Sequence, residues 1–207
     1  MAFPVKMKHK KGVLIVFEGI DGSGKTTQAR ALVRRLRARG RKAVFFREPT
    51  RGHWGREIRR RAVRAGSLTP AEELNLFVLD RKENVAKNLR PALERGKIVV
   101  LDRYYFSTMA YQGAKGIDPE RIRRLNERFA VKPDLVVILD VGAGEGLARI
   151  GDRKVREELF EREDYLARVR EIFRSLRGPR FFHVDGAKGR REIGRIIQAR
   201  VNALLNN

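Results

Sequence analysis

The sequence contains no cysteine, few histidines and no long apolar run, and each shortage excludes a class of site or protein. Without cysteine among its 207 residues, the chain cannot form a disulfide framework, a thiol nucleophile or a Cys-ligated zinc site. The three histidines, His9, His53 and His183, are scattered and lack metal-ligand spacing. No stretch approaches the roughly 20 apolar residues that a membrane helix requires.

The N-terminal segment also lacks the pattern of a secretory signal. Residues 1–11 are basic, but the apolar run that follows, Val13–Phe17, is short and stops at Glu18. We therefore expect a soluble, cytoplasmic protein. The length predicts a single domain over residues 1–207 with one continuous core.

Acidic residues are scarce relative to basic ones, and the formal net charge is +22. Such an excess attracts anions, among them nucleic acids, anionic membranes and nucleotide phosphates. Much of the charge falls in helical stretches, including Arg30–Arg41, Arg56–Arg64 and Arg121–Arg128, where charged side chains usually face water. We therefore expect small anionic substrates as partners rather than a nucleic acid or a membrane.

Short apolar runs alternate with longer amphipathic stretches along the chain. The predicted strands are Val13–Phe17, Ala43–Phe46, Ile98–Leu101, Leu135–Leu139 and Phe181–Val184. The predicted helices are Lys25–Arg39, Pro70 towards Asn88, Pro91–Arg95, Pro119–Phe129, Phe160–Leu176 and Arg190–Leu205. This alternation predicts a three-layer α/β fold, in which a five-stranded parallel sheet is flanked by helices and ligands bind at the C-terminal ends of the strands.

A phosphate-binding loop (P-loop) joins the first predicted strand to the first predicted helix. Residues 19–26 match G-x-x-x-x-G-K-[ST] at every fixed position. The glycines let backbone N–H groups point at a phosphate beside the positive end of the helix. Lys25 can reach the β- and γ-phosphates of ATP, and the Thr26 hydroxyl can bind Mg²⁺. The expected nucleotide-binding residues are Gly19, Ile20, Asp21, Gly22, Ser23, Gly24, Lys25, Thr26 and Thr27.

Other features favour a kinase among the proteins that carry this loop. A GTPase would show an N-K-x-D tetrapeptide after a later strand, and the sequence contains none. An ATPase motor would place an acidic residue after an apolar strand to polarise water. Here Asp102 is followed at once by Arg103, which suits a second, phosphate-bearing substrate.

Arginines at neighbouring strand ends are candidates for holding that second phosphate. Arg47 ends the second predicted strand and Arg103 follows the third, and guanidinium groups bind phosphate oxygens in pairs. Phe77 and Arg81 are four residues apart and share one helix face. The pair suits a nucleobase that stacks on the ring and accepts a hydrogen bond, although a core phenylalanine beside a surface arginine would show the same spacing.

Together these motifs resemble thymidylate kinase, a family of P-loop nucleoside monophosphate kinases. The resemblance rests on residues 18–28, 47–49, 76–81 and 102–112, which occur in the family's order. It implies that the chain phosphorylates dTMP to dTDP, a step towards dTTP, with ATP and Mg²⁺. It also implies a homodimer and a cis peptide bond before Pro49.

The resemblance and the residue chemistry together assign roles within the expected site. The expected catalytic residues are Asp21, Lys25, Arg103 and Arg153, and the expected magnesium ligands are Thr26 and Asp102. The expected substrate-binding residues are Asp21, Arg47, Glu48, Phe77, Arg81, Arg103, Ser107, Tyr111, Gln112 and Phe160.

The match to the family thins after the fourth predicted strand. Residues 142–146 are glycine-rich where the family has a proline and an acidic helix start, and a polar, arginine-containing stretch follows. We expect a lid at about residues 149–159 that closes over ATP. Family members carry a catalytic arginine in the P-loop or in the lid. Gly22 leaves none in this loop, so we expect Arg153 or, failing that, Arg149 to supply it.

Three further points stay open at this stage. Phe160 stands near the position of a family tyrosine that screens the deoxyribose, and Tyr165 is an alternative for that role. The nearest alternative function is a kinase for another nucleoside monophosphate or for a deoxynucleoside, and the latter would need a glutamate base after the second strand, where Glu48 lies. A nucleic-acid-stimulated ATPase would account for the charge of +22.

Overall fold

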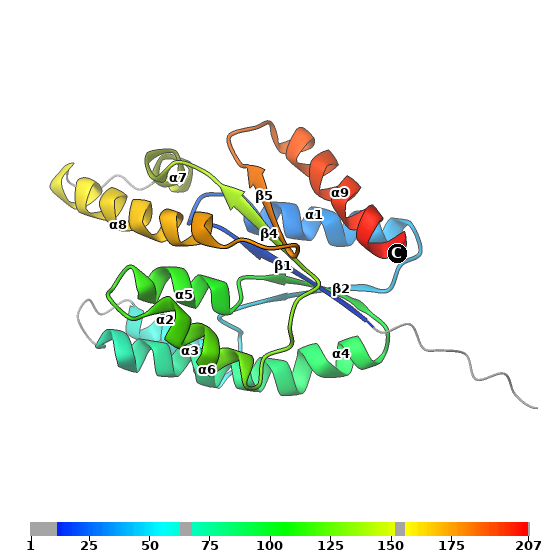
Figure 1. The fold of residues 1–207 in the computed structure, drawn as a ribbon, viewed down its shortest axis with the longest axis horizontal. Helices are drawn as coiled ribbons and strands as arrows, with labels where there is room; N and C mark the ends of the chain where they lie inside the picture. Colours follow the sequence, from blue (N-terminus) through cyan, green and yellow to red (C-terminus); the bar gives the residue numbers. More distant parts are fainter. Residues whose placement is uncertain (1–11, 63–67, 152–155, 207) are drawn as a thin grey trace, which may run out of the picture.

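The computed structural model describes residues 12–62, 68–151 and 156–206, apart from the side chains of residues 156–161. Within these ranges five parallel strands form one sheet in the order β2-β3-β1-β4-β5 (Figure 1). The strands are β1 (Val13–Glu18), β2 (Ala43–Arg47), β3 (Ile98–Asp102), β4 (Leu135–Asp140) and β5 (Phe181–Asp185). All five predicted strands are confirmed, and each extends one residue further, to a charged side chain.

Helices cover both faces of the sheet and make the three layers that were predicted (Figure 1). Helices α1 and α9 pack on one face, and η1, α4, α5, α6, α7 and α8 contribute to the core on the other. The helices are α1 (Lys25–Ala38), α2 (His53–Ala62), α3 (Pro70–Asn84), the π-helical turn η1 (Val85–Leu89), α4 (Arg90–Glu94), α5 (Tyr105–Gly113), α6 (Pro119–Glu127), α7 (Ala143–Ile150), α8 (Arg156–Ser175) and α9 (Arg190–Asn206).

Strand β1 is central, and both of its faces are buried. Leu14 and Val16 point into the core on one side of the sheet, whereas Ile15 and Phe17 point into the core on the other. A strand covered on both faces reads as a continuous apolar run. Because β1 lies between β3 and β4, the loop after it opens at the middle of the C-terminal edge of the sheet.

Helix α7 occupies the glycine-rich stretch where no helix was predicted. Glycine is a poor helix former, but here it allows α7 to approach the P-loop closely. A Cβ atom on Gly146 would lie 2.6 Å from the carbonyl oxygen of Asp21, and one on Gly22 would lie 2.0 Å from that of Gly146. Gly22 also has a φ of 75°, so a larger residue would be both strained and blocked.

Helix α3 begins with a complete capping box. The Thr69 hydroxyl accepts the N–H of Glu72 at 3.3 Å, and the Glu72 carboxylate accepts the N–H of Thr69 at 2.8 Å. We expect Thr69→Ala to lower the free energy of unfolding by about 1 kcal/mol. Urea denaturation measures this change, and Thr27→Ala, which lies outside this box, is the control for loss of a threonine. A loss below about 0.3 kcal/mol would mean that the box does not stabilise the helix.

Candidate active site

The P-loop is shaped for an anion. Lys25 folds back over it, and its Nζ donates to the carbonyl oxygen of Ile20 at 2.7 Å. Gly24 precedes α1 with a φ of 85°, and no side chain of the described residues caps this helix. The first-turn N–H groups of α1 therefore remain available for a phosphate.

The ammonium group of Lys25 lies in a buried position. Burial, followed by the charge of Arg103, lowers the pKa of Lys25 to about 7. The nearby carboxylates of Asp21, Asp102 and Glu18 oppose this shift only in part. A polyphosphate placed on the loop would supply the missing negative charge and favour the protonated amine.

Thr26 and Asp102 form a small oxygen site next to the loop. The Thr26 hydroxyl donates to Asp102 Oδ2 at 2.5 Å, and Arg47 Nε lies 3.6 Å from the same oxygen. The other oxygen, Oδ1, is buried and has no hydrogen-bond partner among the described residues. The described residues contain no group of three or more His, Cys, Asp or Glu side chains that could hold a metal. Mg²⁺ binds through one or two protein oxygens together with phosphates and water, so these residues fit that ion.

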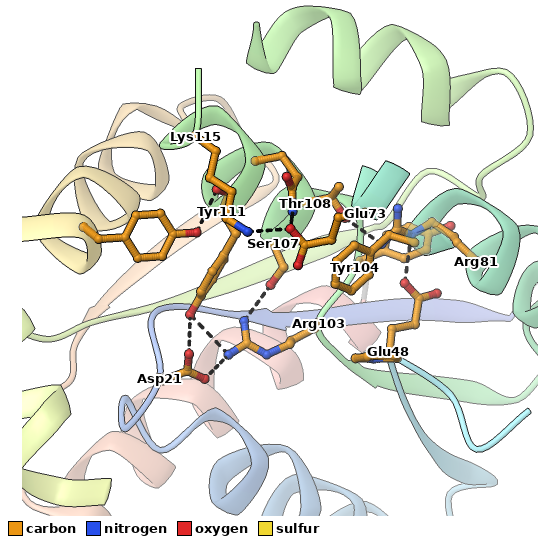
Figure 2. A pocket seen from close by; sticks show the side chains of 14 residues that line it. Asp21, Glu48, Glu73, Arg81, Arg103, Tyr104, Ser107, Thr108, Tyr111 and Lys115 are labelled. Carbon is orange, nitrogen blue, oxygen red and sulfur yellow. Dashed lines mark hydrogen bonds and ion pairs between the residues drawn. The ribbon is translucent and has the colours of Figure 1, made fainter. Parts of the chain in front are cut away.

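Arg103 connects the P-loop to α5 (Figure 2). Its Nη2 lies 2.5 Å from Asp21 Oδ1 and its Nη1 donates to Ser107 Oγ at 3.0 Å. The Tyr111 hydroxyl donates to Asp21 Oδ2 at 2.9 Å, and the guanidinium lies 5.1 Å from the Tyr111 ring centroid. Burial alone would raise the pKa of Asp21, but the charges of Arg103 and Lys25 outweigh it and lower that pKa. Asp21 is therefore ionised and Arg103 is held in a defined direction.

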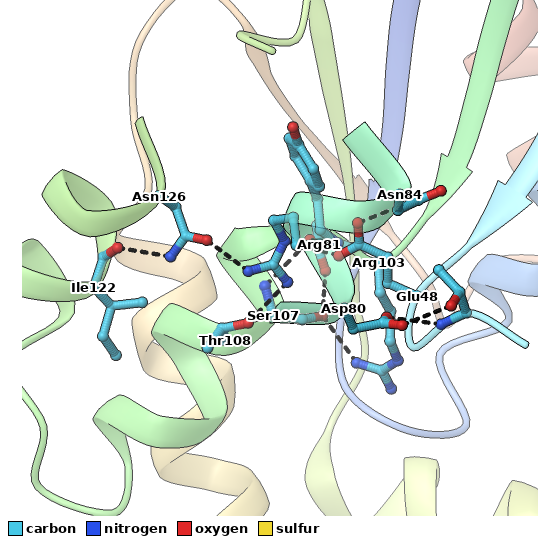
Figure 3. A network of polar contacts seen from close by, with 12 residues as sticks. Glu48, Asp80, Arg81, Asn84, Arg103, Ser107, Thr108, Ile122 and Asn126 are labelled. Carbon is cyan, nitrogen blue, oxygen red and sulfur yellow. Dashed lines mark hydrogen bonds and ion pairs between the residues drawn. The ribbon is translucent and has the colours of Figure 1, made fainter. Parts of the chain in front are cut away.

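Arg81 is held by three neighbouring side chains at the opposite end of the site (Figure 3). It is 1% exposed, and its Nε donates to Glu48 Oε2 at 2.8 Å. Its two terminal nitrogens donate to Asn126 Oδ1 at 2.7 Å and to Thr108 Oγ1 at 3.0 Å. A guanidinium carries five N–H donors, so two are left for a ligand.

Glu48 is fully engaged in that network. Its second oxygen accepts a hydrogen bond from Asn84 Nδ2 at 3.0 Å, and burial raises the pKa of its carboxyl group against the charge of Arg81. Both oxygens thus hold neighbouring side chains, which disfavours a role as a free catalytic base. The bond from Glu48 to Pro49 is cis, as the resemblance implied.

A cavity of about 260 Å³ joins these two groups of residues. At its wall, Gln112 Nε2 donates to Glu73 Oε2 at 2.8 Å, and Gln112 Oε1 is buried without a partner among the described residues. The Tyr165 hydroxyl donates to the carbonyl oxygen of Tyr111 at 2.9 Å. The lining residues are Asp21, Glu48, Pro49, Glu73, Phe77, Arg81, Arg103, Tyr104, Ser107, Thr108, Tyr111, Gln112, Lys115 and Tyr165.

Some expected site residues do not lie in this cavity. Arg47 is exposed, because β2 is an edge strand, and it lines a separate hollow. Arg149 Nη2 contacts Glu145 at 2.5 Å and donates to the carbonyl oxygen of Gly186 at 2.9 Å. Arg153 and the side chain of Phe160 lie outside the described residues.

Other residues of the site were not predicted from the sequence. Thr108 and Asn126 hold Arg81, and Glu73 and Lys115 pair across the cavity wall at 2.5 Å. Glu18 is buried at the end of β1 and contacts the start of α5. One signal could have identified Glu18: it is a charged residue that directly continues an apolar run.

No helix in the described part of the chain has both the length and the apolar character required for crossing a membrane.

Comparison with known proteins supports the reading from the motifs. A family model described as thymidylate kinase matches residues 17–197. The thymidylate kinase of Akkermansia muciniphila is 49% identical over 185 residues, which cover 89% of each chain. That of Brachyspira hyodysenteriae is 43% identical over 183 residues, covering 88% of this chain and 90% of its own. The crystal structure of thymidylate kinase from Ehrlichia chaffeensis matches with a TM-score of 0.76 and 28% identity, and covers 92% of this chain and 99% of that one. The family resemblance is thus confirmed: the chain belongs to the thymidylate kinase family.

Proposed function

We propose that this protein transfers the γ-phosphate of ATP to dTMP and releases dTDP and ADP, a step towards dTTP. An oxygen of the dTMP phosphate attacks the γ-phosphorus, and the bond to the β-phosphate oxygen breaks. The observation that carries this proposal is one cavity that is lined both by Arg103 and Asp21, beside the P-loop, and by Phe77 and Arg81 of α3. Groups suited to phosphate chemistry and to base recognition would thus share one site.

The donor end consists of the P-loop and Lys25. The free N–H groups at the start of α1 and the ammonium group would bind the phosphates of ATP. Thr26 and Asp102 would hold Mg²⁺, which when bound neutralises charge on the phosphates. The remaining expected nucleotide contacts, from Gly19 to Thr27, belong to the same loop and helix start.

The acceptor end begins at Arg103. Its guanidinium would bind the phosphate of dTMP and neutralise the charge that repels the γ-phosphate. Asp21 and Tyr111 orient Arg103, and Ser107 supports it from the other side. We also propose that Arg47, which lies 3.6 Å from Asp102 Oδ2, is a second ligand of the acceptor phosphate, as the resemblance implies.

The base end would read thymine. Phe77 offers a ring for stacking, and Arg81 has N–H groups left for a base carbonyl. Gln112 presents a side-chain amide whose oxygen has no partner among the described residues. Glu48 acts by holding Arg81 in place.

Four expectations from the sequence remain proposals: a lid at about residues 149–159 with Arg153 or Arg149 on the transferring phosphate, a sugar contact from Phe160 or Tyr165, a cytoplasmic location and a homodimer. Size-exclusion chromatography with light scattering tests the homodimer. A molar mass of one chain would contradict it.

Removing the proposed stacking ring should weaken dTMP binding. Base–aromatic stacking contributes about 1–3 kcal/mol, so we expect Phe77→Ala to raise the KM for dTMP about 5- to 150-fold while the KM for ATP stays within about twofold. Phe182→Ala, which removes a partly buried ring on β5, is the matched control and should leave both KM values unchanged. An unchanged KM for dTMP in Phe77→Ala would exclude stacking on this ring.

Binding of ATP should be accompanied by proton uptake at Lys25. Free Lys25 loses its proton above pH 7, and bound phosphates raise its pKa, so affinity should fall as the pH rises above 7 and the complex should take up close to one proton at pH 8. Calorimetric titration with ATP in two buffers of different ionisation enthalpy measures the uptake. Equal proton uptake at pH 6 and pH 8 would contradict this assignment.

A substrate panel tests the proposed function. The protein is incubated with ATP, Mg²⁺ and, one at a time, dTMP, dUMP, dCMP, AMP, GMP and thymidine. We expect diphosphate chiefly from dTMP. Phosphorylation of thymidine or preference for another monophosphate would overturn the assignment of the acceptor.

A further inference from the structure

Glu18 is a buried acid at the centre of the sheet that has no direct role in the proposed reaction. It ends β1, and it is 0% exposed. Burial of a carboxylate is costly unless hydrogen bonds compensate for the lost water. The groups that donate hydrogen bonds to the buried Glu18 carboxylate therefore indicate its role.

One oxygen of Glu18 caps helix α5 from another element. Oε1 accepts the N–H of Tyr104 at 2.8 Å and the N–H of Ser107 at 3.2 Å. The N-cap residue of α5, Tyr104, provides no side-chain cap of its own. Glu18 thus satisfies the N–H of Tyr104 and shares the N–H of Ser107 with the carbonyl oxygen of Tyr104, which lies 3.0 Å from it. A negative charge is favourable at that end of the helix.

The other oxygen of Glu18 reaches Arg103 through a single hydroxyl group. Oε2 lies 2.5 Å from Ser107 Oγ, and Arg103 Nη1 donates to the same Oγ at 3.0 Å. An arginine can only donate, so the one hydroxyl proton of Ser107 is directed at Glu18. On its other side Arg103 pairs with Asp21 (Figure 2). The guanidinium is therefore fixed between two carboxylates, one in direct contact and one through Ser107.

The backbone of Arg103 is constrained at the same point. Its φ is 68°, in the left-handed region that residues other than glycine seldom adopt. The N–H of Arg103 donates to the carbonyl oxygen of Phe17, the neighbour of Glu18, at 3.0 Å. Residues 17 and 18 at the end of β1 thus hold both the backbone and the side chain of Arg103.

We propose that Glu18 is a positioning residue for phosphate transfer, which acts through Ser107 and the first turn of α5 to aim the guanidinium of Arg103 at the acceptor phosphate. The inference rests on the proposed function, in which Arg103 binds dTMP. Burial raises the pKa of Glu18 to about 7, while the hydrogen bond from Ser107 and the charge of Arg103 favour the carboxylate.

A double-mutant cycle with Glu18→Gln and Ser107→Ala tests the proposal. Glutamine keeps the shape and can accept both backbone N–H bonds, but it directs a donor at Ser107 where an acceptor is needed. We expect each single variant to raise the Kd for dTMP, measured by calorimetry without ATP, about 10-fold, with the KM for ATP within about twofold. The Kd for dTMP of the double variant should be about equal to the higher of the two single-variant Kd values, because both changes interrupt the same path from Glu18 to Arg103.

The matched control is Asp80→Asn. Asp80 is a second buried carboxylate that accepts a backbone N–H at 2.8 Å and a hydroxyl at 2.6 Å, both from Thr50, and it does not line the cavity. This variant should lower the melting temperature without changing the Kd for dTMP.

Two results would overturn the role of Glu18: a Glu18→Gln variant with a lower melting temperature but an unchanged Kd, or effects of the two changes that add in full. Should Glu18→Gln fail to fold, an unchanged Kd for dTMP in Ser107→Ala would still overturn the role of Glu18, since this variant keeps the cap and removes the path to Arg103. Because Ser107 also lines the cavity, a raised Kd is assigned to the path only if Glu18→Asp, which shortens the acid, raises it as well. Failure of the wild-type protein to phosphorylate dTMP would instead refute the proposed function.

Discussion

Arg103→Ala is expected to lower kcat/KM for dTMP about 10²- to 10³-fold, measured with saturating ATP and Mg²⁺. The guanidinium is the cation at the junction of the P-loop and the cavity, and it binds Asp21 and Ser107 at the same time. Its removal takes away the charge that Arg103 would place on the acceptor phosphate and frees Asp21 to repel that phosphate.

Arg103→Lys separates charge from geometry. Lysine keeps the positive charge but cannot bind Asp21, Ser107 and a phosphate in the directions of a planar fork. We expect it to recover only part of the lost kcat/KM. Circular dichroism and the melting temperature should show that both variants are folded. A folded Arg103→Ala protein whose kcat/KM lies within about threefold of the wild type would refute the central role of this residue.

Arg81→Met is expected to lower the free energy of unfolding by about 3–5 kcal/mol at pH 7, measured by urea denaturation. Arg81 and Glu48 form a salt bridge at 2.8 Å in which both side chains are almost completely buried. Without the guanidinium, the Glu48 carboxylate stays in the interior, and among the described residues Asn84 alone still donates a hydrogen bond to it. Asn126 and Thr108 would also lose their donor.

Protonation of Glu48 and the added substitution Glu48→Gln should each reduce the loss of stability in Arg81→Met. Burial raises the pKa of Glu48 in the folded protein above its ordinary value of 4.5. The folded state therefore holds the proton of Glu48 more tightly than the unfolded state does. The stability that this proton contributes is fully present below pH 4.5 and is lost as the pH rises through the higher pKa of the folded protein. The loss in Arg81→Met should thus be smaller at pH 4 than at pH 7. Adding Glu48→Gln should restore at least half of it at pH 7. An equal loss at both pH values would show that the unpaired charge is not its cause.

The sheet could be predicted from the sequence because its strands are buried on both faces and read as apolar runs. Each strand nevertheless extends one residue further than the run, to Glu18, Arg47, Asp102, Asp140 and Asp185. A charged residue usually marks the end of a strand in a pattern. Here these residues sit at the C-terminal edge of the sheet, and two of them, Glu18 and Asp102, belong to the site. Because each predicted strand ends before a charged residue, Glu18 was not recognised as part of the site.

Helix α5 was not predicted, although it carries Ser107, Tyr111 and Gln112. It is buried almost all round and therefore has no polar stripe from which a helical period could be read. The partners of Arg81 were hidden for another reason. Thr108 and Asn126 are 27 and 45 residues away in the chain, and only the packing of α3 against α5 and α6 brings them together.

The P-loop could be placed from a local pattern alone. The spacing of Phe77 and Arg81 left open a core phenylalanine beside a surface arginine, and the structure instead buries Arg81 and places both residues in the cavity lining. Arg47 could not be placed from a local pattern, because its position at a strand end does not show that the strand lies at the edge of the sheet. Pairing order depends on contacts between segments far apart in sequence, and no local pattern records it.

The most direct test of the whole account is the balance between ADP and dTDP. The wild-type protein is incubated with ATP, Mg²⁺ and dTMP, and both products are measured over time by chromatography, with and without dTMP. The account predicts one dTDP for every ADP and almost no ADP when dTMP is absent. ADP that forms at the same rate without dTMP, or without any phosphorylated acceptor, would show that the protein hydrolyses ATP and would contradict the assignment as a kinase.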